Sequence, residues 1–272
     1  MSGLDLDAYL ARIGYAGELR PDLATLRALH RAHLLSVPYE NLDVQLGRPV
    51  TTDPAAAFDK IVRRRRGGWC YEMNGAFGLV LQALGFPVTR LAGAVMREAL
   101  GADNLASHLV LRVDLEETWL ADVGYGDGPI EPFQPVEGGY VQRGFDFGRE
   151  RLADGWLRMR NHRFAPRSFD LRLEPAIEAA LSEKCAQLQS APTSIFVHNA
   201  IVQRHTPEGI VLLRNRTLRR ISPDGAEERL VDGPAEYVAI LQDVFGLDLP
   251  QAADLWPRIC AQHEAALAPA AT

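Results

Sequence analysis

The sequence predicts an α+β protein whose first third is helical and whose middle third is a small antiparallel sheet or barrel. Up to about residue 85, apolar residues recur every three or four positions, which is typical of helices that bury one face. From Pro87 onward they alternate, as in strands with one buried side. The chain of 272 residues is 47% hydrophobic and 24% charged, which is the composition of an ordinary globular protein.

Three helices are predicted in the first third, over residues 22–35, 54–62 and about 70–84. Pro38 stops the apolar pattern of the first helix. Asp53 is suited to cap the start of the second. The third begins just after Gly67-Gly68, and Gly85 supplies its end.

Strands are predicted in the middle of the chain, at residues 88–96, 106–115, 118–123, 155–162 and 169–173. The clearest is 106–115, where Leu109, Leu111 and Val113 share one face and His108 lies on the other. Glycine-, proline- and aspartate-rich turns separate these candidates. An antiparallel arrangement is therefore expected.

The last third mixes helices and hairpins. The predicted elements are a helix over 174–188, a hairpin within 194–220 that turns at 207–209, a turn at 223–225, helices over 234–244 and 250–262, and a frayed tail at 265–272.

Charge and cysteine content exclude several classes of function. Lys and Arg number 29 against 35 Asp and Glu, so no overall positive charge attracts nucleic acid or an anionic membrane. The three cysteines are too few and too widely spaced for a disulfide framework or a Cys-x-x-Cys metal site. No signal peptide or membrane span is recognised, so we expect a cytoplasmic protein. We also expect no metal and no permanently bound cofactor.

The stretch Arg66-Gly67-Gly68-Trp69-Cys70-Tyr71-Glu72-Met73-Asn74-Gly75 is the most informative in the chain. A cysteine in the first turn of a helix lies among unpaired backbone N–H groups at the positive end of the helix dipole, and both favour a thiolate. The glycines allow a sharp turn and close approach of a substrate to the sulfur. Cys70 is thus a candidate nucleophile. Taken alone, it is equally well a small buried core residue.

A thiolate needs a base, and the base needs an orienting partner. His108 lies on a predicted strand, and Asp122 ends the next one, so neighbouring strands could place them side by side. The imidazole would then contact the Cys70 sulfur and donate its other N–H to Asp122. From the residues alone, this geometry is only permitted, because a histidine in such a strand is more often structural and Asp122 could simply end a strand.

Taken together, these motifs resemble the arylamine N-acetyltransferase family in order and spacing. The resemblance rests on residues 66–75, on Ser107-His108 and on Asp122-Val123-Gly124-Tyr125-Gly126, and it extends upstream to residues 12–15, 30–33 and 37–44. It is strong to about residue 130 and thinner beyond, although Ser194-Ile195-Phe196-Val197 and the hairpin after it still fit.

The resemblance implies three domains and a reaction. The domains are a helical bundle (1–85) carrying the cysteine, an antiparallel β-barrel (86–190) carrying the histidine and aspartate, and an α/β lid (191–272), on a cysteine-protease-like catalytic core. Cys70, His108 and Asp122 would form a triad. Its thiolate would take an acetyl group from the co-substrate acetyl-CoA and pass it, by a ping-pong mechanism, to an arylamine, arylhydrazine or arylhydroxylamine.

The resemblance also implies binding residues. Tyr39, Val95, Tyr125 and Phe196 would line the acceptor pocket; the family often has Phe at the two tyrosine positions, so the hydroxyls would either change acceptor preference or point to solvent. A turn containing Gly124, Gly126, Asp127 and Gly128 would border the CoA phosphates, although such a turn is more often simply a turn. The enzyme would act as a monomer or homodimer.

Other charged and polar features have simpler interpretations. Arg66 and Glu72 are expected to form a structural ion pair bracing the Cys70 loop. In the cationic run Arg63 to Arg66, the residues Arg63 to Arg65 are expected to be a solvated helix end rather than a CoA site. His30 and His33, without a third ligand nearby, are expected in the core or at the surface, and Cys185 and Cys260 in the core.

Three other functions remain open at this stage. The same triad serves a papain-like or transglutaminase-like hydrolase or transpeptidase, or an amide synthase that takes its acyl group from a carrier protein. A non-enzymatic binding module is the third, and an inert Cys70 would favour it.

Overall fold

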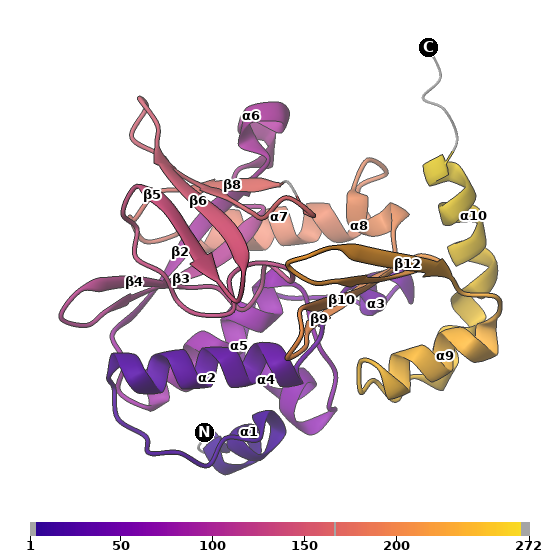
Figure 1. The fold of residues 1–272 in the computed structure, drawn as a ribbon, viewed down its shortest axis with the longest axis horizontal. Helices are drawn as coiled ribbons and strands as arrows, with labels where there is room; N and C mark the ends of the chain where they lie inside the picture. Colours follow the sequence, from indigo (N-terminus) through magenta and orange to yellow (C-terminus); the bar gives the residue numbers. More distant parts are fainter. Residues whose placement is uncertain (1–3, 166, 268–272) are drawn as a thin grey trace.

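The N-terminal part of the protein is a group of helices that packs beneath a β-sheet (Figure 1). The computed structural model describes residues 4–165 and 167–267. The first elements are α1 (Leu6–Ile13), α2 (Leu23–Ser36), the two-residue strand β1 (Tyr39–Glu40), α3 (Leu42–Gln45), α4 (Pro54–Phe58), the π-helical turn η1 (Asp59–Arg63) and α5 (Cys70–Ala83).

The three predicted helices are present, and the second differs in kind from the prediction. The Asp22 carboxylate accepts a hydrogen bond from the Thr25 amide at 2.8 Å and so caps α2. Asp53 caps α4 in a similar way. The predicted helix over 54–62 is α-helical only at first and continues as the wider turn η1, in which Lys60 is buried.

One apolar core joins these helices to the larger sheet. Tyr9 of α1, Leu26 of α2 and Phe77 of α5 are fully buried in the same cluster as Leu111 and Val113. The buried helix face predicted from the spacing of the leucines is therefore confirmed. That face packs on a sheet as well as on other helices.

The larger sheet has seven antiparallel strands in the order β4-β3-β2-β8-β7-β6-β5. They are β2 (Val88–Val95), β3 (His108–Asp114), β4 (Thr118–Ala121), β5 (Gly138–Gln142), β6 (Phe145–Arg151), β7 (Leu157–Arg160) and β8 (Ser168–Leu171), with the short helices α6 (Arg97–Leu100) and η2 (Gly101–Asn104) between β2 and β3. The sheet curls into a half-barrel that has β4 and β5 at its two edges.

The strands β5 and β6 were missed by the sequence analysis. Their sequence is rich in glycine and charge, and β5 is mostly exposed. Phe145 and Phe147 of β6 are buried and pack with Ile210 and Ile221 of the other sheet. These strands are stabilised by a contact between distant segments, which the local pattern does not show.

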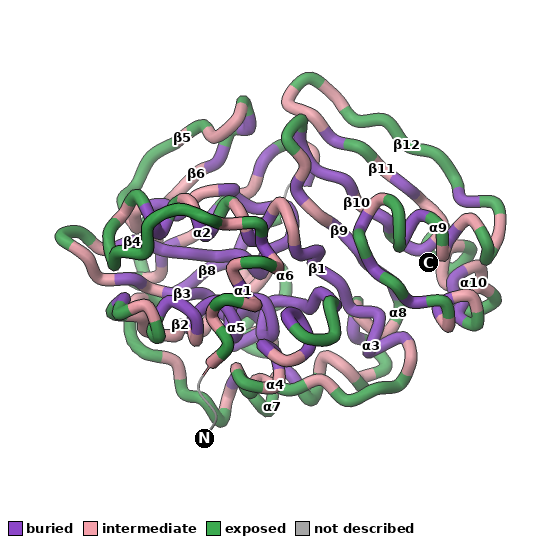
Figure 2. The backbone as a smooth tube through the Cα atoms, turned by 90° about the horizontal axis from the view of Figure 1, so that it is seen from below, coloured by how far each residue is buried: buried purple, intermediate pink, exposed green. Residues whose placement is uncertain are grey.

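The smaller sheet has the order β1-β9-β10-β11-β12, and helices flank it. The remaining elements are α7 (Glu178–Ser190), α8 (Ile195–His198), β9 (Ile201–His205), β10 (Ile210–Arg214), β11 (Thr217–Ile221), β12 (Ala226–Leu230), α9 (Pro234–Asp243), η3 (Pro250–Leu255) and α10 (Trp256–Leu267). Figure 2 shows β9 and β10 largely buried and β12 exposed at the edge.

The predicted hairpin and final helices are confirmed with changes at their ends. The pair His205 and Ile210 closes the hairpin at the predicted turn. The predicted helix over 250–262 starts as the 3-10 helix η3 and continues as α10 to Leu267, so residues 265–267 are helical rather than frayed. The rest of the predicted tail, 268–272, lies outside the described residues.

Strand β1 ties the N-terminal part to the smaller sheet. Tyr39 pairs with Gln203 of β9 and forms a second bridge to Gly68, two residues before the start of α5. The loop that presents Cys70 is therefore held by both parts of the molecule. Among residues 4–165 and 167–267, no helix is long and apolar enough to cross a membrane.

Candidate active site

Cys70 is the first residue of α5 and is almost completely buried. A methyl group on Gly67 would lie 1.9 Å from the carbonyl oxygen of Pro38, and one on Gly68 would lie 2.6 Å from Cβ of Glu72. The glycines are thus required because backbone and side chain pack tightly behind the Cys70 loop. This is a different reason from substrate access, which the sequence suggested.

A buried charge cluster holds this loop in place. Lys60 Nζ lies 2.8 Å from both Glu72 Oε1 and Asp43 Oδ2. The Arg66 guanidinium lies 2.7 Å from Glu40 and 3.1 Å from Asp43. The expected direct pair between Arg66 and Glu72 is wrong, since the partner of Glu72 is Lys60.

The cationic run is therefore divided between two environments. Arg63 and Arg64 are exposed and pair with Asp59, as expected for a solvated helix end. Lys60 and Arg66 point inward, because three buried carboxylates require partners there. Glu72 also accepts a hydrogen bond from the Trp69 amide at 3.2 Å, so the cluster reaches the residue before Cys70.

Glu72 makes stability depend on pH. Burial raises its pKa from 4.5 to about 7, and Lys60 opposes this only in part. Between those values the folded state retains a proton that the unfolded chain has lost, so this group's contribution to stability falls as pH rises. We expect the free energy of unfolding of the wild type, relative to Glu72→Gln, to fall between pH 4.5 and 7 in urea titrations. Groups outside this charge cluster cancel in that difference.

The control for this titration is Glu18→Gln, which neutralises an exposed carboxylate paired with Arg20. Relative to Glu18→Gln, the wild type should show no such pH trend. A flat difference for Glu72→Gln as well would contradict the assignment.

His108 and Asp122 are brought together by the adjacent strands β3 and β4. His108 Nε2 lies 2.7 Å from Asp122 Oδ2, and both side chains are buried. The other carboxylate oxygen accepts hydrogen bonds from Asn74 Nδ2 at 2.8 Å and from the Gly124 amide at 3.0 Å. The carboxylate is therefore fixed on both sides before any substrate arrives.

The pair is strongly coupled electrostatically. Burial by itself lowers the pKa of His108, but the charge and hydrogen bond of Asp122, with a smaller contribution from the Cys70 side chain, raise it to about 10. The pKa of Asp122 is lowered, because His108 and the Asn74 and Gly124 donors outweigh its burial. The stability that His108 contributes is complete below pH 6.5 and is lost as pH rises toward 10.

Two polar residues that hold the Asp122 loop, Asn74 and His30, were not assigned to the site from the sequence. Asn74 lies one turn after Cys70 on α5, and its Oδ1 accepts from the Val123 amide at 2.9 Å. His30 accepts from the Asp122 amide at 3.1 Å through Nε2, so Nδ1 is the nitrogen that donates to the Ile130 carbonyl. Burial lowers the pKa of His30 to about 4, which keeps it neutral.

His33 and the remaining cysteines have no part in this arrangement. His33 is buried and contacts the Tyr9 hydroxyl at 2.8 Å, so both histidines of the pair at 30 and 33 belong to the core. Cys185 is buried as expected, whereas Cys260 is only partly buried. Among the residues that the structure describes, no three His, Cys, Asp or Glu side chains are grouped to hold a metal ion.

Aromatic side chains surround Cys70 and His108. The Tyr125 ring lies 5.2 Å from the His108 ring, and the Phe169 ring lies 4.9 Å from both. Phe196 contacts Trp69 at a ring distance of 5.0 Å, and Tyr39 belongs to the same buried cluster as Cys70. Val95 packs against the cluster containing Tyr125 and Phe169. Tyr39, Tyr125 and Phe196 therefore lie around Cys70 and His108, and Val95 packs against the neighbouring cluster; their role in a pocket stays a prediction.

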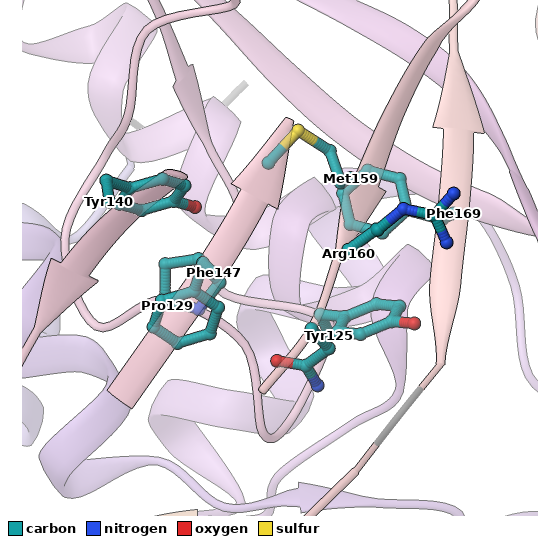
Figure 3. Close-up of a pocket in the computed structure, with 8 residues that line it drawn as sticks. Tyr125, Pro129, Tyr140, Phe147, Met159, Arg160 and Phe169 are labelled. Carbon is teal, nitrogen blue, oxygen red and sulfur yellow. The ribbon is translucent and has the colours of Figure 1, made fainter. Parts of the chain in front are cut away.

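A small cavity extends from these aromatics into the half-barrel (Figure 3). Tyr125 and Phe169 form its side nearest His108, and Tyr140, Phe147 and Met159 continue it. Its volume of about 10 Å³ is roughly the space that one water molecule requires. Within the described residues, the buried Tyr125 hydroxyl has no hydrogen-bond partner.

Comparison with known proteins identifies the family. A family model described as N-acetyltransferase matches residues 22–254. The arylamine N-acetyltransferase of Escherichia coli is 34% identical over 258 residues, which cover 91% of this chain and 90% of that protein. The enzyme of Mycolicibacterium smegmatis is 36% identical, covering 90% and 93%.

The chain belongs to the arylamine N-acetyltransferase family. The Mycobacterium marinum arylamine N-acetyltransferase in complex with CoA has a similar fold, with a TM-score of 0.85, 31% identity, and coverage of 95% of this chain and 98% of that one. The resemblance seen in the sequence is confirmed, and the protein is an acyltransferase enzyme.

Two glycines of the turn after Asp122 are explained by packing and by backbone conformation, since Gly126 has a φ of +83°. A methyl group on Gly124 would lie 2.7 Å from Cα of Cys70, and one on Gly126 would meet the Gln203 side chain at 1.6 Å. Gly124 therefore allows the Asp122 loop to lie directly against the Cys70 backbone. The assignment of this turn to CoA stays a prediction.

Asp127 has structural partners in the same turn. Its buried carboxylate accepts from Asn161 at 2.9 Å and from Arg167 at 3.3 Å. These contacts hold the turn against the loop between β7 and β8, beside the pocket aromatics.

Phe169 was missed by the sequence analysis as a residue of the site. The signal that could have found it was an aromatic residue in a predicted strand.

Proposed function

We propose that the protein transfers an acetyl group from acetyl-CoA to an arylamine, arylhydrazine or arylhydroxylamine through an acetylated Cys70. The observation that carries the proposal is the Cys70, His108 and Asp122 group, with a 2.7 Å contact between histidine and carboxylate, surrounded by aromatic side chains. The names of the relatives support an arylamine acceptor, and the CoA bound to the Mycobacterium marinum protein supports a CoA thioester as the donor.

In the first step, the Cys70 thiolate attacks the thioester carbonyl carbon, and the C–S bond to CoA breaks. The leaving CoA sulfur takes the proton from His108, which becomes neutral. Protonated His108 favours the thiolate beforehand because its charge lies beside the sulfur at a helix N-terminus. We assign stabilisation of the oxyanion to backbone N–H groups near Cys70.

In the second step, the acceptor nitrogen attacks acetyl-Cys70 and passes a proton to His108, and the Cys70 thiolate leaves. The resting ion pair is restored, and the net products are the acetylated amine and CoA thiol. An aromatic amine suits this step because its low basicity leaves its nitrogen unprotonated at neutral pH. Asp122 holds the imidazole in one orientation and stabilises its charged form.

The binding sites follow from the same arrangement. Tyr39, Val95, Tyr125 and Phe196 would hold the flat ring of the acceptor. The turn Gly124–Gly128 would border the CoA path, because it follows Asp122 directly and packs on Gln203 of the smaller sheet. We also propose the division into a helical bundle, a barrel domain and a lid, with a core like that of cysteine proteases.

The test is the mass of the intact protein after incubation with acetyl-CoA and no acceptor. We expect a gain of one acetyl group, mapped by peptide mass spectrometry to Cys70 rather than to Cys185 or Cys260, and its loss after an arylamine is added. Absence of the adduct, with Cys70 still alkylated rapidly by iodoacetamide, would show that the donor is wrong and would favour an amide synthase or hydrolase. An unreactive Cys70 would overturn the enzymatic proposal.

A further inference from the structure

Among the predicted pocket residues, Phe196 lies on the element that is least able to hold its own position. It lies on α8, a helix of four residues, and its ring contacts Trp69, the neighbour of Cys70. A helix this short cannot stabilise itself, and its last carbonyl groups have no partners within it. The position of the Phe196 ring therefore depends on the groups that bind the α8 backbone.

Two sets of side chains bind the carbonyl groups of α8. The Phe196 carbonyl accepts from Asn41 Nδ2 at 2.9 Å and from Gln45 Nε2 at 2.6 Å. The Val197 carbonyl accepts from Arg258 at 3.1 Å and from Gln262 Nε2 at 2.9 Å. The first set comes from the N-terminal part, and the second comes from α10, the last helix described.

The two sets are joined to one another at Gln45. Arg258 also donates to the Gln45 carbonyl at 3.1 Å, and Gln262 Nε2 donates to Gln45 Oε1 at 3.0 Å. Because Oε1 of Gln45 accepts from α10, its Nε2 is turned toward the Phe196 carbonyl. A chain of hydrogen bonds thus runs from Gln262 through Gln45 to the backbone of Phe196.

We propose that α10 positions the acceptor pocket, with Gln262 and Arg258 as positioning residues that set where the Phe196 ring lies against Trp69. The inference rests on the proposed function, which assigns Phe196 to the acceptor. Arg258 and Gln262 are one turn apart on α10, and both donate hydrogen bonds to Val197 of α8 and to Gln45 of α3.

The fold allows this network to be cut without losing the helix. Ile259 of α10 is fully buried in the core of the smaller sheet, together with Tyr237 and Leu255, and that core does not include α8. A groove beside α10, lined by Arg258, Gln262, His198 and Arg214, also leaves room for side-chain changes. Variants at position 262 are therefore expected to remain folded.

The test variant is Gln262→Glu, which keeps the side-chain length but replaces the donor with a carboxylate facing two acceptor oxygens. Gln262→Met removes the donor without adding charge and serves as the second variant. Glu264→Gln, an exposed position on the same helix, is the matched control. Thermal unfolding of each variant checks that the fold is retained.

The readout separates the two halves of the reaction. Acetylation of Cys70 by acetyl-CoA should change less than twofold in Gln262→Glu and Gln262→Met. Discharge of the acetyl group by phenylhydrazine should slow about tenfold, whereas discharge by hydrazine, which has no ring to place, should be unchanged. Equal slowing with both acceptors, or no slowing with either, would overturn the proposal.

A double-mutant cycle with Phe196→Ala tests whether the effect passes through that ring. If α10 acts by placing Phe196, Gln262→Glu should slow phenylhydrazine discharge little further once the ring is gone. Independent, multiplying losses would overturn the inference. A wild type that forms no acetyl-Cys70 would instead overturn the proposed function, so the two failures are distinguishable.

Discussion

Cys70→Ala is expected to abolish acetyl transfer completely while leaving the protein folded. Alanine fits the same buried space at the start of α5, and the hydrogen bond from the sulfur to the Ser107 carbonyl is long, at 3.8 Å. Without the sulfur there is no group to carry the acetyl between the two substrates. Steady-state assays with acetyl-CoA and an arylamine, with circular dichroism of the same sample, measure both effects.

Cys185→Ala is the matched control for that experiment. Burial raises the pKa of Cys185 to about 12, so its thiol is neutral and unreactive at physiological pH. This variant should keep wild-type turnover. Measurable transfer by Cys70→Ala, or loss of activity in Cys185→Ala alone, would place the nucleophile elsewhere.

Asp122→Asn is expected to lower kcat, and with it kcat/KM, by about 10⁴-fold, the size of effect on kcat seen when the carboxylate of such a triad is replaced by an amide. The Asn74 and Gly124 donors would bind the oxygen of the new amide, which turns its NH₂ group toward His108 Nε2. That nitrogen must then accept, and its proton moves to Nδ1. His108 would also lose the charge that raises its pKa.

Asp114→Asn controls for a general effect of neutralising an aspartate on the strand that carries His108. Asp114 ends the same strand, β3, and pairs with Arg112 at the far end from the site. We expect this variant to keep wild-type kcat/KM between pH 6 and 9. Near-wild-type activity of Asp122→Asn over the same range would remove Asp122 from the mechanism.

Local patterns determined the elements that carry the site. The helix over Cys70 to Ala83 was predicted within one residue of its end, because a glycine pair before it, a glycine after it and an apolar stripe all act within a few residues. The strand of His108 was predicted for a similar reason. Strands β5 and β6 were not, since Phe145 and Phe147 are stabilised by the distant residues Ile210 and Ile221.

The sequence by itself determined the family, the helix that presents Cys70 and the candidates His108 and Asp122, because these depend on motifs of fixed order and on short-range geometry. Their catalytic roles stay predictions. Only the tertiary structure decided that Lys60, not Arg66, pairs with Glu72, and that Asn74 and His30 hold Asp122. Only the tertiary structure showed that α10 contacts the backbone of α8, next to Phe196. Partners of buried charges and carbonyl groups are chosen by packing between distant segments, which the spacing of residues along the chain does not encode.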